Sequence, residues 1–488
     1  MKKTSIIVAI LFLFISINTL YSQSISNGFS VSGTGFSSAI LTDYQCVGLN
    51  PANLGWKRNE HLVNFGIGQT NFAVYSEPLK RELVKELFNK SKENFNQEEK
   101  DQAARMFTDS KLQFEGNING VGFSFQDEKI GGFGMAIREK VMWNSTFSES
   151  IADILFKGYN ASYFDSLTVN TEGDTVGWAT VPQMASDILE NTKISLVWYR
   201  EYNFSYGHSI INTENVSIYG GVGVKYLEGY NLFNFAYEEG GDYVAYTSIN
   251  PAIGLTFGQS PSRVDNNRYQ ATGRGWGIDI GLSAFLYDHF RIAASVVDIG
   301  SIKWDKNVYV IKNDFVKNIQ DEGMNSFNIF DLQNTEAFEN LKWGGWEGAE
   351  NITTALPMSV RTGAAYILKK KYEFGAEMYI PVNADAPGAY DKMIVGGGFR
   401  AMPVNWFRFS AGVVSGANTG TSFPVGISFF PFNRGSFTWE IGFATNDIST
   451  FFQQEKPTVS LAFGLFRFSF GHLGRGGTST TLDETSLF

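Results

Sequence analysis

Apolar and polar residues alternate along many segments of this chain with the period of a β-strand. In residues 437–444, Phe, Trp, Ile and Phe take every second position, with Thr, Glu, Gly and Ala between them. The same alternation recurs in 216–225, 276–286, 372–380 and 422–429. Because successive side chains of a strand point to opposite faces, each segment predicts a strand with one apolar face and one polar or small face.

The connections between these segments alternate between very short and long. Short breaks predict tight turns at 126–130, 211–215, 287–290, 369–371, 402–405 and 433–435, and the main long loops at 76–110, 145–191, 228–271 and 305–354. Short turns at one end and long loops at the other are typical of outer-membrane barrels. The breaks delimit 14 strands, at 61–75, 111–126, 131–144, 192–210, 216–230, 272–287, 290–305, 355–368, 371–383, 391–402, 405–417, 421–432, 436–447 and 457–471.

These features predict an all-β protein, a 14-stranded antiparallel transmembrane β-barrel whose long loops are partly helical. The even strand count puts both ends of the barrel at the short-turn side, which we expect to face the periplasm. Residues 242–257 are compatible with a further strand inside their loop. In the last strand the apolar parity changes, which predicts a bulge near Leu465.

The two ends of the chain do not belong to the predicted barrel (61–471). Lys2 and Lys3 precede a short apolar run that ends in small residues at Ser22, which predicts a secretory signal peptide in 1–22. Residues 23–60 alternate poorly and are expected to form a hatch in the barrel lumen, which a barrel of this size can hold. Residues 472–488 form a Gly-, Ser- and Thr-rich tail, expected in the periplasm.

The predicted hatch carries the motif Asn50-Pro51-Ala52 directly before the first strand, with a small-residue stretch upstream. In this position the motif resembles the plug motif of the FadL-type outer-membrane transporters of long-chain fatty acids and other hydrophobic compounds. The chain looks most like their diverged relatives in Bacteroidetes-type bacteria, which include barrel subunits of the type IX secretion system. Asn53 stands where the family pattern has Gly. The resemblance implies 14 strands, an N-terminal hatch and a Gram-negative cell outer membrane location.

Composition excludes several other classes of protein. The net charge of −10 argues against a nucleic-acid partner, since phosphate binding needs clustered Lys and Arg. One Cys and four His predict no zinc site, and we expect no cofactor. His61, His208, His289 and His472 all fall at the predicted short-turn rim. A hydrolase at the opposite face would therefore lack a histidine base, so we expect no enzyme and no catalytic residues.

The polar strand faces supply the candidate ligand-binding residues. Arg138, Lys225, Arg361 and Arg408 are expected to point into the lumen together with several Asp and Glu. The mixed signs favour ion pairs among these groups or with the hatch. Alternatively, one or two of the cations hold the carboxylate of a ligand.

The family resemblance implies passive uptake of hydrophobic small molecules, such as fatty acids, by a barrel whose main partner is the lipid bilayer. The alternative is a non-transporting barrel that serves as a scaffold or partner subunit in secretion or surface attachment. Uptake predicts a continuous apolar path from the loops to the hatch. A scaffold predicts a filled lumen and an exposed apolar patch on the loops.

Overall fold

The computed structural model of the chain describes residues 28–471. The description omits 57–61, 89–93, 238–242, 254–256, 265, 267, 288, 312, 329–345, 370, 417–419, 435 and 456 within that range. The predicted signal peptide and the C-terminal tail lie outside the described residues, as do His61 and His472.

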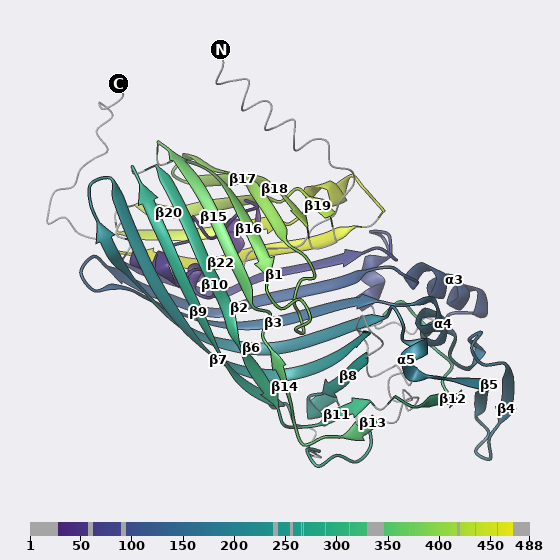
Figure 1. Cartoon of the computed structure of the whole chain (residues 1–488). Helices are drawn as coiled ribbons and strands as arrows, with labels where there is room; N and C mark the ends of the chain where they lie inside the picture. Colours follow the sequence, from purple (N-terminus) through teal and green to yellow (C-terminus); the bar gives the residue numbers. More distant parts are fainter. Residues whose placement is uncertain are drawn as a thin grey trace.

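A closed antiparallel barrel dominates the fold (Figure 1). Each strand pairs with the next one around the ring, and the last strand pairs with the first. The predicted 14-stranded barrel is confirmed. Its strands are β1 (Val63–Ser76), β2 (Leu112–Asp127), β3 (Gly131–Thr146), β6 (Lys193–Asn212), β7 (Val216–Tyr237), β9 (Gly273–Leu286), β10 (Phe290–Trp304), β15 (Ser359–Leu368), β16 (Tyr372–Pro381), β17 (Ile394–Val404), β18 (Phe407–Gly416), β20 (Val425–Arg434), β21 (Phe437–Thr445) and β22 (Thr458–Phe470).

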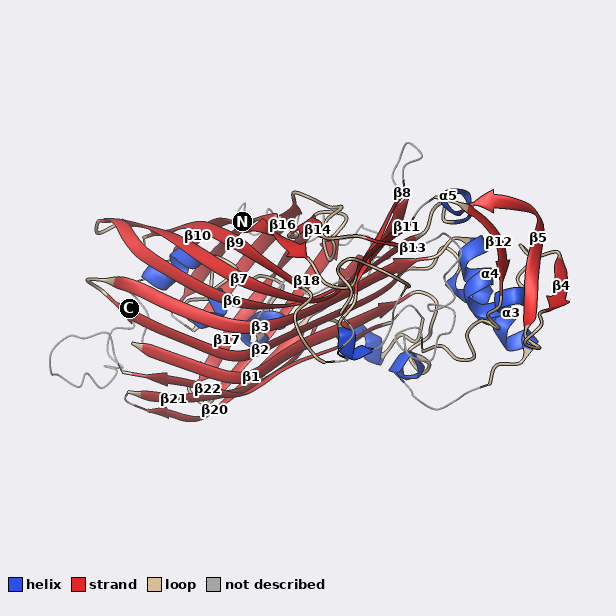
Figure 2. Ribbon diagram, turned by 90° about the horizontal axis from the view of Figure 1, so that it is seen from below, coloured by secondary structure: helices blue, strands red, loops and turns tan. Residues whose placement is uncertain are grey.

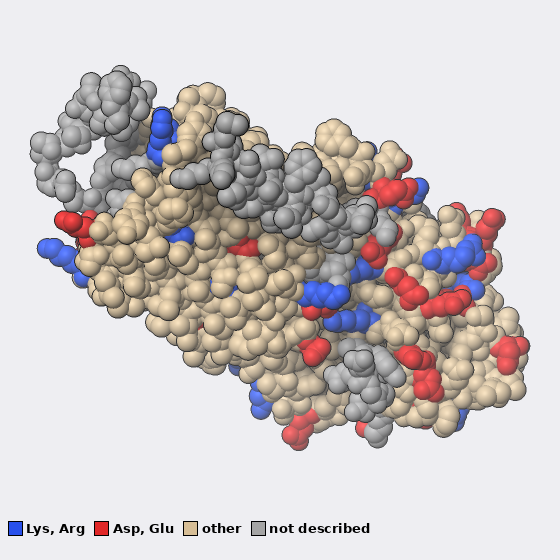
Figure 3. All heavy atoms as spheres, turned by 45° about the horizontal axis from the view of Figure 1, so that its top comes forward, with Lys and Arg blue, Asp and Glu red and all other residues tan. Residues whose placement is uncertain are grey.

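The two faces of the wall differ as the alternation predicts. Along β9, Ile278, Ile280 and Leu282 are exposed on the outside, whereas Asp279 and Ser283 are buried on the inside. Figure 3 shows the outer surface of the wall almost without charge, while Lys, Arg, Asp and Glu gather over the loops. An apolar wall of closed strands satisfies every backbone group without water and is a surface for lipid. Within the described ranges, no helix has the length and apolar character that a bilayer span requires.

The long loops gather at one end of the barrel and build a cap (Figure 2). The cap contains helices and a separate small sheet around its own apolar core, which includes Phe107, Phe147 and Phe156. Its elements are η3 (Val84–Phe88), α3 (Gln97–Phe107), α4 (Glu149–Lys157), η4 (Gly158–Asn160), β4 (Ser166–Val169), β5 (Thr175–Met184), α5 (Ala185–Ile188) and β12 (Phe315–Ile319).

Five short strands extend the barrel sheet at the loop end, so that this sheet has 19 strands in the described part of the chain. They are β8 (Tyr243–Ser248), β11 (Val308–Ile311), β13 (Trp346–Gly348), β14 (Ile352–Ala355) and β19 (Gly420–Ser422). The remaining short helices at this end are η5 (Pro251–Ile253) and η6 (Ile448–Phe451).

The structure decides two details of the strand prediction. Residues 242–257, which are compatible with a further strand, contain β8. This strand pairs with β7 and β11 and lies outside the closed ring. β7 therefore continues to Tyr237, past the predicted start of the loop at 228, because β8 supplies its partner. The bulge near Leu465 is confirmed, since the β21–β22 register shifts between Glu440 and Gly442.

The N-terminal segment 28–56, called the hatch from here on, lies inside the barrel (Figure 2). Its backbone touches the wall where the wall has glycine. A Cβ at Gly221 would lie 2.3 Å from the backbone nitrogen of Ala52, and one at Gly398 would lie 2.4 Å from the carbonyl oxygen of Thr34. Any side chain at these positions overlaps the hatch, so glycine sets how closely hatch and wall approach.

We predict that Gly221→Ala destabilises the folded barrel by about 1–3 kcal/mol, the usual cost of overpacking. Gly120→Ala is the matched control, because the nearest atom to its Cβ would be 3.6 Å away. The temperature at which the compact band on a detergent gel converts to the unfolded band measures both. Equal conversion temperatures for the two variants would show that the hatch does not pack against Gly221.

Candidate functional site

The hatch is folded by three short helical turns, two of which have side-chain caps. Asp43 accepts a hydrogen bond from the Gln45 backbone nitrogen at 2.8 Å, and Asn50 accepts one from that of Ala52 at 3.1 Å. Pro51 is the first residue of its turn, where its fixed φ angle and missing N–H are tolerated. The turns are α2 (Phe29–Ser32), η1 (Tyr44–Cys46) and η2 (Pro51–Gly55).

The Asn50-Pro51-Ala52 motif lies against the wall on the side of β6, β7 and β9. The Asn50 amide donates to the carbonyl oxygen of Leu282 at 3.1 Å, and the wall opposite it is Gly281, where a Cβ would lie 2.0 Å from Asn50 Oδ1. The motif therefore both starts η2 and positions it on the wall.

Ion pairs hold the hatch to the other side of the barrel. Asp43 pairs with Arg467 on β22, which also pairs with Glu440 on β21. Arg408 on β18 joins the same group by pairing with Glu440. These side chains are largely buried, so the charges compensate one another inside the lumen.

A second contact holds the upstream part of the hatch. Glu377 on β16 accepts hydrogen bonds from the backbone nitrogens of Ser37 and Ser38, the latter at 3.0 Å. Arg361 on β15 donates to the same carboxylate at 3.2 Å. Glu377 is thus bonded both to the hatch and to a wall arginine.

Two further candidate cations, Arg138 on β3 and Lys225 on β7, are buried on the inner face of the wall. Arg138 pairs with Glu201 at 2.9 Å and donates to the carbonyl oxygen of Tyr44 in the hatch at 3.2 Å. Lys225 pairs with Asp279 at 2.9 Å and with Asp298. Both cationic side chains are 0% exposed.

The four predicted ligand-binding cations therefore differ in their surroundings. Arg138, Lys225 and Arg408 lie in ion pairs of the wall, two of them tied to the hatch directly or through Arg467. Arg361 differs because it also borders a cavity. Within the described ranges, no group of His, Cys, Asp and Glu is arranged to hold a metal ion.

This cavity, of about 60 Å³, lies between the hatch and the loops, in contact with Gly48 of the hatch. Polar and charged side chains supply most of its lining, among them those of Glu115, Asn117, Lys140, Tyr199, Asp298, Arg361, Tyr379 and Tyr390. A volume of this size holds a few water molecules or one small polar group.

The Tyr199 hydroxyl is a buried polar group of this lining to which the described residues give no hydrogen bond. The Tyr199 residue is 1% exposed. A buried hydroxyl without a partner is costly and calls for a water or ligand beside it. The sequence analysis missed Tyr199, although it shares its strand face with Glu201 and Asn203, both of which are buried.

The cavity adjoins an apolar cluster as well as polar groups. Tyr199 and Met142, which line the cavity, join it to a buried cluster that contains Val197, Leu227, Ile302 and Trp304. Around the hatch, the buried side chains of the wall include amides and charges as well as small apolar residues such as Ala136.

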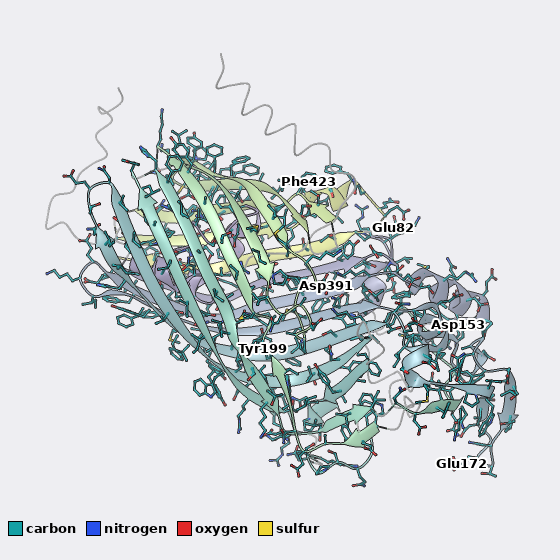
Figure 4. The ribbon with its side chains drawn as sticks, viewed as in Figure 1. Glu82, Asp153, Glu172, Tyr199, Asp391 and Phe423 are labelled. Atoms are coloured by element: carbon teal, nitrogen blue, oxygen red, sulfur yellow. The ribbon has the colours of Figure 1, made fainter. Side chains whose placement is uncertain are left out.

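The loop after β16 covers the cavity on the cap side. Gly388 and Tyr390 of this loop line the cavity, and the Tyr390 hydroxyl donates to Glu115 at 2.8 Å. Asp391 pairs with Lys193 at 2.9 Å and Lys111 at 3.4 Å, both on the opposite wall (Figure 4 labels Asp391 and Tyr199). We call residues 382–393 the roof loop.

The ion pairs of the roof loop lower the pKa of Asp391. Burial alone would raise the pKa of Asp391, but Lys111 and Lys193 outweigh it and hold this pKa below its usual value. A carboxylate with a lowered pKa stabilises the fold above its unfolded pKa of about 4, and this contribution is lost as pH falls through the folded pKa.

Residues 51–434 match the model of one protein family, described as "Family of unknown function (DUF5723)". Comparison with curated proteins finds no match. Among solved structures, the chain is similar to the toluene transporter TbuX of Ralstonia pickettii (TM-score 0.45, 11% identity, 93% of this chain and 100% of that chain). It is also similar to the Pseudomonas putida toluene transporter TodX (0.43, 10%, 93% and 100%) and to a Pseudomonas aeruginosa FadL homologue (0.42, 8%, 93% and 100%).

We predict that Asp391→Asn lowers stability at pH 7 by about 1 kcal/mol, as expected for a partly exposed ion pair. The difference from the unmodified protein should shrink as pH falls through the lowered pKa of Asp391, because the protonated side chain no longer pairs with Lys111 and Lys193. Thermal unfolding in detergent from pH 7 to the acid range measures it. Asp385→Asn, a change of an exposed residue in the same loop, is the control. A deficit in Asp391→Asn that does not shrink as pH falls would contradict the assigned ion pairs.

Proposed function

The chain belongs to DUF5723, a family of unknown function, and we propose that it is an outer-membrane barrel for passive uptake of small hydrophobic molecules that carry a polar head. The polar cavity and the apolar cluster that adjoins it carry this proposal. An amphiphilic molecule, of which a fatty acid is the simplest example, places its apolar part toward Leu227 and Trp304 and its head beside Arg361, Lys140 and Tyr199. Arg361 and the Tyr199 hydroxyl are then the groups that bind the head.

Orientation follows from the distribution of turns and loops. The short turns, the start of β1 and the end of β22 lie at the hatch side of the barrel, and the cap lies at the other side. We place the hatch side in the periplasm and the cap outside the cell, as is usual for such barrels. A molecule then enters under the cap and roof loop and leaves past the hatch.

The hatch contacts support a plug that can be displaced. Its ties to the wall include ion pairs and hydrogen bonds, notably Asp43–Arg467 and the bonds that Glu377 accepts. Water can replace polar contacts of this kind at far lower cost than it can separate an apolar interface. The described arrangement is accordingly the closed state of the proposed channel.

A second function is favoured by the filled lumen. In this alternative the hatch seals the barrel permanently, and the cap attaches a secretion or surface-protein partner. The two proposals differ in whether the lumen ever binds a small molecule or conducts ions.

We predict that the protein in lipid nanodiscs binds laurate, and that Tyr199→Phe weakens binding about tenfold or more. A hydrogen bond to a charged group contributes about 1.5–3 kcal/mol. Tyr287→Phe, at an exposed turn, is the control and should bind as the unmodified protein does. Isothermal titration calorimetry gives the affinities. Absence of laurate binding in the unmodified protein would rule out a fatty-acid head in this cavity.

We also predict that Asp43→Asn opens the hatch more often. Loss of the ion pair with Arg467 should raise the open fraction about tenfold, equivalent to about 1.4 kcal/mol. Single-channel recording in planar bilayers measures it, with Glu455→Gln, which removes an exposed pair with Lys80, as the control. A silent membrane with both variants, together with no laurate binding, would favour the sealed scaffold.

A further inference from the structure

The three-stranded sheet of the cap lies at the end of the molecule furthest from the barrel (Figures 1 and 2). Its strand order is β12-β5-β4, so β4 and β12 are its two edges in the described part of the chain. β4 pairs with β5 through residues 166–169, and no other described strand pairs with it. Its outer row of backbone groups faces away from the sheet.

The β4 edge is only four residues long, which limits strand addition, but it carries no side chain that blocks it. Its sequence is Ser-Leu-Thr-Val, with no charge and no proline, and all four residues are exposed. Leu167 is 53% and Val169 is 69% exposed. The opposite edge, β12, carries an exposed Lys317 in its middle. Since charged residues and proline are how sheets protect their edges, β12 is protected and β4 is open.

The surroundings of β4 are acidic. The stretch 165–175, which forms β4 and its turn into β5, contains three exposed carboxylates and no Lys or Arg; they are Asp165, Glu172 and Asp174. Figure 4 labels Glu172 at the tip of the β4–β5 hairpin. The nearest cation of the same sheet is Lys317, on the far edge. A partner at the β4 edge therefore meets a concentrated negative charge beside two exposed apolar side chains.

We propose that the β4 edge binds an extended segment of another protein by strand addition, and that this segment alternates basic and apolar residues. The backbone of the segment pairs with β4, its apolar residues cover Leu167 and Val169, and its cations face the three carboxylates. A second copy of this chain is disfavoured as the occupant because it would bring the same three negative charges to the interface. The proposal does not depend on uptake, since β4 lies in the cap, away from the lumen.

The probe is a fluorescein-labelled heptapeptide of alternating Lys and Val, titrated with the full chain in zwitterionic nanodiscs and measured by fluorescence anisotropy. Empty nanodiscs give the background. We expect binding to weaken at least tenfold in the variant Leu167→Ser/Val169→Ser. Phe315→Ser, an exposed apolar change on the other edge strand, should change it less than twofold. Glu172→Gln/Asp174→Asn should weaken binding severalfold and reduce its salt dependence.

The backbone contribution is tested by the same peptide methylated at every backbone nitrogen, which cannot donate to β4. We expect at least tenfold weaker binding. Equal affinity for the methylated peptide would reduce the contact to non-specific charge attraction and overturn the proposal. A dimer in analytical ultracentrifugation that Leu167→Ser/Val169→Ser abolishes would assign the edge to a second copy and also overturn it. Laurate affinity should be unchanged in these variants, so failure of either proposal is recognised separately.

Discussion

The pairing of β22 with β1 is the contact on which the rest of this structure depends. A wall that faces lipid has no water to satisfy its backbone, so every strand must have a neighbour on both sides. The last strand meets the first through a long antiparallel register that begins at Val63 and Phe470. Closure removes both edges, and it also encloses a lumen that is too wide for the side chains of this many strands to fill.

The hatch fills that lumen, and the way it does so determines the chemistry inside. Glycines on the wall admit its backbone, while amides and charges on the same face bond to it. Each lumenal cation therefore meets an anion nearby, as Arg138 meets Glu201. The cavity at Tyr199 lies beside the hatch and adjoins a buried apolar cluster.

Much of this architecture could be predicted from the sequence. Long, regular alternation marks lipid-facing strands strongly, and the parity change near Leu465 even located a bulge. Some ion pairs also follow from strand register, since Arg138 and Glu201, and likewise Glu440 and Arg467, are direct cross-strand partners. Those pairs could have been predicted once the strands were aligned.

Other features could not be predicted from local pattern. Asp43 and Arg467 are brought together only by the insertion of the hatch, and the roof loop reaches Lys111 and Lys193 across the mouth of the barrel. The cap sheet is built from short segments whose burial depends on contacts with distant helices. The cavity could not be predicted because Tyr199 carries no charge that would distinguish it from other residues on the same strand face.

The single cysteine of the chain offers the most direct test of the central claim, that the N-terminal segment lies inside a closed barrel. Cys46 lies in the hatch and is fully buried. A water-soluble maleimide should leave the folded protein unlabelled in nanodiscs, with both faces accessible, and should label it promptly after heat unfolding. Rapid labelling of Cys46 in the folded protein would place the hatch outside the lumen and contradict the account.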